Sequence, residues 1–163
     1  MQDAYLDAAD KLVADGIEKS TIPLTTTLHH YLALTVARYM RRRLSVDRLT
    51  LRVVEALDRR APPGELRDLA DACLLACAFF ERRLRRAGGS LRHYSGMGQT
   101  AYDAANLTEQ AVSFPHMRDV LVAATARDRP ALVELVDAAR AGSGMARAQL
   151  AADGIIAFPG RRR

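Results

Sequence analysis

Polar and aromatic side chains that could line a ligand pocket gather in one stretch of the chain, residues 91–106. Two glycines, Gly96 and Gly98, lie inside its helical pattern, where each costs about 1 kcal/mol relative to alanine. Such a pair indicates that another helix or a ligand approaches the backbone closely. His93 could also act as an acid or a base near neutral pH. The candidate ligand-binding residues are His93, Tyr94, Gln99, Tyr102 and Asp103. The alternative is a packed helix whose tyrosine hydroxyls reach solvent or a neighbouring carboxylate.

Two cysteines could in principle hold a metal ion. Cys73 and Cys77 are four residues apart and therefore share one face of a helix. A zinc site needs four ligands, and the sequence has neither a second cysteine pair nor two histidines at helical spacing. The adjacent His29 and His30 point about 100° apart on a helix, so they cannot easily bind one ion together. We expect no metal site, buried inert cysteines and a half-buried structural histidine.

The motifs of common enzyme classes are missing from the sequence. It has no GxGxxG after a strand, no phosphate loop, no GxSxG and no zinc-protease helix. We therefore predict no catalytic residue and no cofactor.

Arginine dominates the basic charge. The net charge is +5, and the 24 basic residues include only two lysines, Lys11 and Lys19. An arginine-rich and alanine-rich composition is typical of a GC-rich genome, so the arginine excess has either a genomic or a functional origin. Several arginines lie close together in the sequence. These arginine clusters could form a basic face that attracts phosphates, or could complement the acidic N-terminal part within one fold. The residues of the predicted basic face are Arg41, Arg42, Arg43, Arg82, Arg83, Arg85 and Arg86.

A second feature suits nucleic-acid binding. Residues 131–141 and 145–153 have the lengths of a helix-turn-helix pair, with Arg147 and Gln149 placed to contact bases. Helix pairs with tight turns are common, however, and the apolar residues that follow, 155–158, suit a place in the core.

The elements that position these residues are all predicted to be helices. Residues 72–80 are apolar on every side, which requires burial among other elements. We predict an all-α fold: a single irregular helical bundle of about seven to eight helices around a central buried helix, about 63–87. No pattern of period two predicts a strand.

Helix boundaries follow from capping and breaking residues. Gly16 is predicted to end the first helix, with a linker at 17–24. The predicted N-caps of later helices are any one of Thr25 to Thr27, Ser45 and Ser90. At Pro115 we favour a helix that starts at Ser113; the alternative is one kinked helix from Thr108.

Three segments resemble a family of small all-helical bacterial proteins whose role is uncharacterised. They are TTTLHHYLALTVARYM at 25–40, YSGMGQTAY at 94–102 and GIIAFP at 154–159. The resemblance implies an all-helical fold and a bacterial origin, and it provides no binding or catalytic residue.

The remaining expectations concern organisation and role. At 163 residues the chain suits a single domain, 1–163, with frayed ends at 1–2 and 159–163. Both cysteines lie in an apolar stretch, and the N-terminus has no signal pattern. These features predict a cytoplasmic protein without a membrane anchor. We expect a non-catalytic protein-interaction or adaptor role, with self-association as a homodimer. A small-ligand sensor that uses helix 91–106 and a nucleic-acid-associated protein remain the alternatives.

Overall fold

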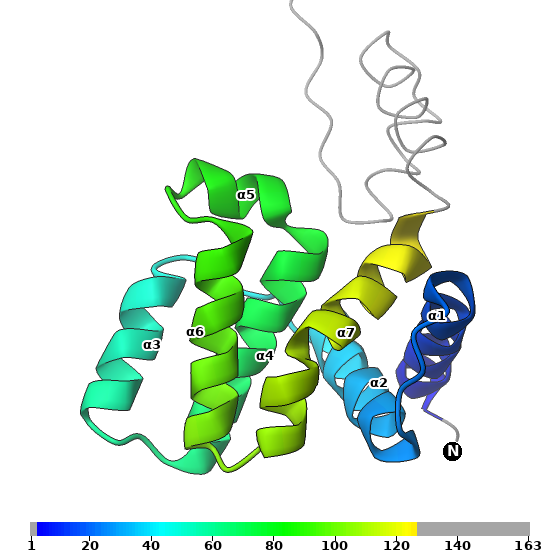
Figure 1. Cartoon of the computed structure of the whole chain (residues 1–163), viewed down its shortest axis with the longest axis horizontal. Coiled ribbons are helices and arrows are strands. Elements are labelled where there is room, and N and C mark those ends of the chain that lie inside the picture. The colour runs from blue at the N-terminus through cyan, green and yellow to red at the C-terminus, as the bar shows by residue number, and fades with distance from the viewer. Residues whose placement is uncertain (1–2, 127–163) are drawn as a thin grey trace, which may run out of the picture. The chain divides into compact units, whose positions relative to one another are not determined.

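Helices account for all the regular structure in the part of the chain that the computed structural model describes, residues 3–126. This confirms the predicted all-α class (Figure 1). The helices are α1 (Ala4–Ser20), α2 (Thr26–Arg41), α3 (Leu49–Asp58), α4 (Pro63–Phe79), α5 (Glu81–Arg86), α6 (Leu91–Ala104) and α7 (Thr108–Ala126).

Contacts within the chain divide it after Ala124, so the arrangement below concerns the first unit, Met1–Ala124. The predicted helices at 131–141 and 145–153, the apolar segment 155–158 and the predicted frayed ends lie outside the described residues. The single-domain organisation stays a prediction. No described helix is long and apolar enough to cross a lipid bilayer.

Two groups of helices are joined by α7. Helix α1 packs against α2, while α4 packs against α3, α5 and α6. Figure 1 shows α7 between the α1–α2 pair and the group that contains α4 and α6. Close packing occurs on both sides of α7, because Gly16 of α1 lies against Val120 and Gly98 of α6 lies against Phe114.

Helix α4 is the predicted buried centre. Every residue from Leu69 to Ala78 is buried, which is the environment that a helix apolar on all sides requires. The helix begins at Pro63, as expected for a proline in the first turn.

The central helix is shorter than the predicted 63–87. It ends at Phe79, and Phe80 adopts a non-helical conformation with φ −124° and ψ 30°. The rings of Phe79 and Phe80 both pack against Tyr39 of α2, with centroids 6.1 and 6.0 Å from the Tyr39 ring. After this break the short helix α5 buries Leu84 and leaves its arginines exposed.

Gly16 does not end the first helix, and residues 17–20 are helical rather than part of a linker. The glycine is buried inside α1, where an added Cβ atom would collide with the carbonyl oxygen of Val120. A glycine is therefore needed here because α7 approaches closely, and not because the helix ends.

Pro115 lies inside one helix that starts at Thr108, so the favoured start at Ser113 is wrong and the alternative is right. Buried residues flank the proline on both sides, with Ala111 and Phe114 before it and Met117 and Leu121 after it. Packing of this continuous face offsets the hydrogen bond that proline cannot make.

Hydroxyl caps account for two of the predicted helix starts. Thr25 accepts a hydrogen bond from the Leu28 N–H, and Ser90 accepts one from the His93 N–H. The predicted cap at Ser45 is wrong, because α3 begins later, at Leu49, with Arg48 as the preceding residue.

Alanine substitution should have opposite effects on stability at the two glycines of α6. At Gly98 a new Cβ would meet the Phe114 ring and, at 3.0 Å, the Cβ of Cys73, whereas nothing lies within 4 Å at Gly96. We expect Gly98→Ala to lower the free energy of unfolding by about 1–3 kcal/mol and Gly96→Ala to raise it by about 0.5–1 kcal/mol. Urea denaturation of the three proteins measures both values. Equal effects at the two positions would contradict the close approach of α7 to α6.

Candidate functional site

Asp71 is a buried carboxylate in the middle of α4, and three side chains from other helices face it. The hydroxyl groups of Tyr31 and Tyr102 both donate hydrogen bonds to its Oδ1 atom, at 2.5 and 2.6 Å. Its other oxygen, Oδ2, lies 4.0 Å from Nη1 of Arg38. Because Tyr31 and Arg38 belong to α2 and Tyr102 belongs to α6, this carboxylate ties three helices together.

Burial is the largest influence on the protonation of this group, and it raises the pKa of Asp71 from 3.8 to about 6. The two tyrosine hydrogen bonds and the charges of Arg67 and Arg38 act in the opposite direction. Burial, together with the nearby carboxylate, raises the pKa of both tyrosine hydroxyls, so these groups remain protonated donors. At neutral pH the site therefore holds a hydrogen-bonded carboxylate.

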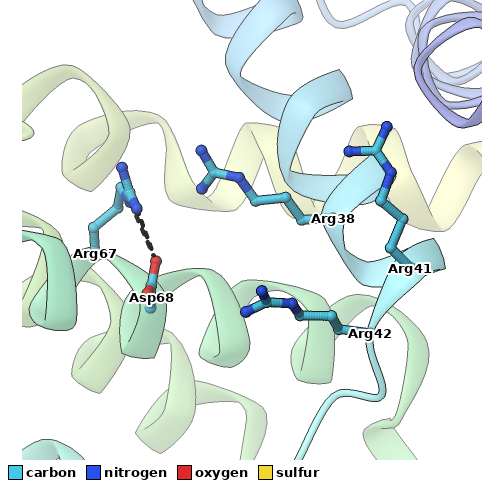
Figure 2. Close-up of a pocket in the computed structure, with 5 residues that line it drawn as sticks. All are labelled: Arg38, Arg41, Arg42, Arg67 and Asp68. Atoms are coloured by element: carbon cyan, nitrogen blue, oxygen red, sulfur yellow. Dashed lines mark hydrogen bonds and ion pairs between the residues drawn. The ribbon is translucent and has the colours of Figure 1, made fainter. Parts of the chain in front are cut away.

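Arginines from α2 and α4 surround a pocket of about 300 Å³ beside this carboxylate. We call it the arginine pocket; it is lined by Arg38, Arg41, Arg42, Arg67 and Asp68. Figure 2 shows the guanidinium groups of Arg38, in α2, and Arg42, directly after α2, pointing toward Arg67 and Asp68. Arg67 is held by Asp68, with Nη2 3.0 Å from Oδ1, and Arg41 forms an ion pair with Asp3.

The local sequence explains why these arginines converge. Arg38 and Arg41 are three residues apart in the last turn of α2, so they lie on the same side of the helix. Arg42 caps the C-terminal end of α2 in an extended conformation. Cations at this end of a helix also interact favourably with its dipole. Arg38 belongs to both features, because it lines the pocket and is the arginine that faces Asp71. The pocket and the buried carboxylate are therefore electrostatically connected.

The structure separates the candidate ligand residues of helix 91–106. Tyr94 and Tyr102 are buried, whereas His93 and Asp103 are exposed and Gln99 is half-buried. None of the five lines the arginine pocket or a second pocket of about 290 Å³ that is bordered by Arg52, Glu65, Asp68 and Leu69. The hydrogen bond of Tyr102 to a carboxylate is what the packed-helix alternative predicts.

His93 has a partner on another helix. One ring nitrogen, Nε2, lies 2.9 Å from the Thr50 hydroxyl oxygen of α3. This contact joins the exposed sides of α3 and α6.

The two clusters of the predicted basic face meet at one junction. Tyr39 near the end of α2 contacts Phe80 at the start of α5. Arg83 of α5 also forms an ion pair with Asp47, with Nη2 3.2 Å from Oδ1, and Asp47 follows closely after Arg43 in the chain. Of the predicted residues, Arg41 and Arg42 line the arginine pocket, whereas Arg43, Arg82, Arg83, Arg85 and Arg86 do not. The predicted helix-turn-helix pair, with Arg147 and Gln149, lies outside the described residues.

The cysteines and histidines have ordinary structural environments. Cys73 and Cys77 are free and buried, and burial raises the pKa of the Cys73 thiol to about 12. Within residues 3–126, no three His, Cys, Asp or Glu side chains gather as a metal site. His29 is half-buried, as predicted for one of the two histidines, and its Nε2 lies 2.8 Å from Oδ1 of Asp10.

Sequence reasoning missed Asp71, Arg38 and Arg67. A usable signal for Asp71 was present, because it is the one acidic residue in the buried run 69–78. A carboxylate in such a run needs hydrogen-bonding or charged partners from neighbouring helices. Arg38 and Arg67 had no such signal, since they come together only through packing.

No family model, curated protein or solved structure matches this chain. Functional assignment therefore depends on the geometry of the arginine pocket and the buried carboxylate beside it.

Replacing Asp71 with asparagine tests the pKa of the buried carboxyl group. A folded-state pKa of about 6, above the usual 3.8, means that the folded protein binds the proton more tightly than the unfolded chain. The resulting stability is fully present below about pH 4 and is lost as the pH rises through 6. We expect the free energy of unfolding of the wild type to fall by about 2 kcal/mol relative to Asp71→Asn between pH 4 and pH 7. Urea denaturation across this range measures the difference, and a pH-independent difference would rule out the raised pKa.

Removal of one tyrosine hydroxyl tests the hydrogen bonds to Asp71. Tyr102→Phe keeps the ring packing against Tyr31 and Phe114 but deletes a donor to a buried carboxylate. We expect a loss of about 1.5–3 kcal/mol at pH 7, and a smaller loss at pH 5, where Asp71 is largely protonated. Tyr94→Phe is the matched control, because Tyr94 is equally buried but does not contact Asp71. Similar losses in the two variants would show that the hydrogen bond adds little.

Proposed function

We propose that this protein is a non-catalytic interaction protein whose arginine pocket receives a phosphate group carried by its partner. The observation that supports this proposal is the convergence of Arg38 of α2 and Arg42, directly after α2, on Arg67 of α4 across a pocket of about 300 Å³ (Figure 2).

The chemistry of arginine favours a phosphate as the occupant. A guanidinium group presents a planar set of donors that fits phosphate oxygens two at a time. A phosphate has several acceptor oxygens around one centre, so donors from α2 and α4 can reach it together. A volume of about 300 Å³ is at the lower end of small-molecule sites, which suits a single charged group rather than a large ligand.

Charge balance also favours an anionic occupant. Four guanidinium groups line the pocket, and three carboxylates pair with them, those of Asp3, Asp68 and Asp71. The pocket therefore has an excess of positive charge, which a bound anion would neutralise.

The lining residues suit binding better than catalysis. Arginine stays protonated at physiological pH and cannot serve as a general base. Asp68 is engaged by Arg67, and both tyrosine hydroxyls occupy one oxygen of Asp71. These groups can orient and neutralise an anion.

A nucleic acid is the second candidate partner, and one observation favours it. The Tyr39–Phe80 contact brings the start of α5 to α2, and the Arg83–Asp47 ion pair joins α5 to the segment that follows Arg43. A phosphate backbone could follow such an extended basic surface.

Isothermal titration with pyrophosphate at low salt tests the pocket directly. We expect Arg42→Gln and Arg67→Gln each to weaken binding by about tenfold, because each removes a charged donor from the pocket. Arg60→Gln is the matched control, since Arg60 is exposed and does not line the pocket. No binding by the wild type, or an equal loss in the control, would refute the proposed site.

A second titration distinguishes the two partners. A phosphoserine peptide bound in an Arg42-dependent manner supports the interaction protein. Binding to short DNA that disappears between about 50 and 200 mM salt and depends on Arg82 and Arg86 supports the nucleic-acid alternative.

A further inference from the structure

The arginine pocket and the buried carboxylate of Asp71 share one side chain, that of Arg38. Its Nη1 atom lies 4.0 Å from Oδ2 of Asp71, and the half-exposed side chain also lines the pocket (Figure 2). Arg67, which lines the pocket from α4, acts on Asp71 through its charge as well. Two of the four arginines that would hold an anion therefore already interact with the buried carboxylate.

The two oxygens of Asp71 have different surroundings. Oδ1 accepts the hydrogen bonds of Tyr31 and Tyr102, whereas Oδ2 is the oxygen nearest to Arg38. A separation of 4.0 Å is longer than a hydrogen bond, so Asp71 acts on Arg38 through its charge and the guanidinium group stays available to an anion. A proton on Oδ2 would leave both tyrosine hydrogen bonds to Oδ1 in place.

Asp71 is the group of this cluster that changes charge near neutral pH, because burial raises its pKa to about 6. The arginines remain protonated, and burial raises the pKa of both tyrosine hydroxyls well above the physiological range. The groups that face Asp71 are Tyr31 and Arg38 from α2, Tyr102 from α6 and Arg67 from α4. Charged groups of the other helices act on the cysteines of α4: Arg52 of α3 on Cys73, and Glu81 of α5 and Arg118 of α7 on Cys77.

An anion in the pocket and an ionised Asp71 repel each other, because both are negative and both interact with Arg38. Protonation of Asp71 removes this repulsion and adds one positive charge to the net charge of the site. Thermodynamic linkage makes the effect reciprocal. An anion that binds the protonated form more tightly must also raise the pKa of Asp71.

We propose that occupancy of the arginine pocket is coupled to protonation of Asp71, so that an anion of fixed charge binds more tightly as the pH falls and its binding takes up a proton at Asp71. This inference rests on the proposed function, because it requires the arginine pocket to hold the anion. It adds a form of regulation to that function, since the buried carboxylate makes the affinity of the pocket depend on pH.

Isothermal titration with sulfate at low salt tests the coupling. Sulfate has the tetrahedral oxygens of a phosphate group but stays fully ionised near neutral pH. We expect the dissociation constant of the wild type to fall about three- to tenfold from about pH 7.5 to about pH 5. Asp71→Asn has a neutral side chain at every pH, so at both values it should bind sulfate about as tightly as the wild type does at the lower pH.

Two further variants serve as controls for this titration. Asp58→Asn makes the same chemical change at an exposed carboxylate outside both pockets, and it should keep the pH dependence of the wild type. Arg42→Gln removes a donor from the pocket but leaves Arg38 and Asp71 unchanged. It should weaken sulfate binding by a similar factor at both pH values. Circular dichroism confirms that all variants fold.

A direct measurement on the wild type needs no variant. The chemical shift of the Asp71 side-chain carboxyl carbon, followed by NMR across the pH range, reports the protonation of this group. We expect saturating sulfate to move the midpoint of the titration upward from about pH 6 by about half to one pH unit. Sodium chloride at the same ionic strength is the control, and it should move the midpoint less.

The outcomes separate this inference from the proposed function. Absence of sulfate binding at either pH would refute the arginine pocket and the coupling together. Binding that Arg42→Gln weakens, but whose pH dependence is the same in the wild type and Asp71→Asn, would retain the pocket and refute the coupling alone. A titration midpoint of Asp71 that sulfate does not move more than sodium chloride does would also refute the coupling.

Discussion

The carboxylate of Asp71 lies within a helix that is buried from Leu69 to Ala78, and an ionised group there is costly unless other groups compensate it. The compensation comes from two tyrosine hydroxyls and, at longer range, from Arg38. Tyr31 belongs to α2 and Tyr102 to α6. Their hydrogen bonds to the Asp71 carboxylate therefore constrain where α2 and α6 lie along α4. Packing of apolar side chains alone would tolerate more variation in this position.

The buried charge of Asp71 also affects the arginine pocket at the surface. Arg38 faces Asp71 with one side of its guanidinium group and lines the arginine pocket together with Arg42 and Arg67. The charge of the buried carboxylate therefore helps to hold a positive group at the pocket wall. The charge that Asp71 needs as a partner in the core is therefore also part of a surface that suits anions. Protonation of Asp71 near pH 6 would weaken the attraction between Asp71 and Arg38.

Close backbone packing provides the other constraint. Gly16 and Gly98 allow α7 to approach α1 and α6, and neither position has room for a Cβ atom. These two glycines explain how one helix, continuous through Pro115, can pack against both groups of helices. The reactive-looking residues, in contrast, have structural roles: Cys73 and Cys77 fill the core, and His93 contacts Thr50.

The sequence by itself determined the all-helical class, the buried centre of α4 and the cap at Ser90, and it limited the cap of α2 to Thr25–Thr27, because periodicity and capping are local properties. It also indicated close packing at Gly98. Tertiary structure decided the break at Phe80, the helical state of residues 17–20 and the continuity of α7, since each depends on contacts with distant segments. It also decided the site, because Tyr31 and Arg38 of α2, Asp71 of α4 and Tyr102 of α6 come from three helices that are far apart in the chain. A carboxylate can show from its sequence position that it needs partners, but only packing determines which side chains provide them.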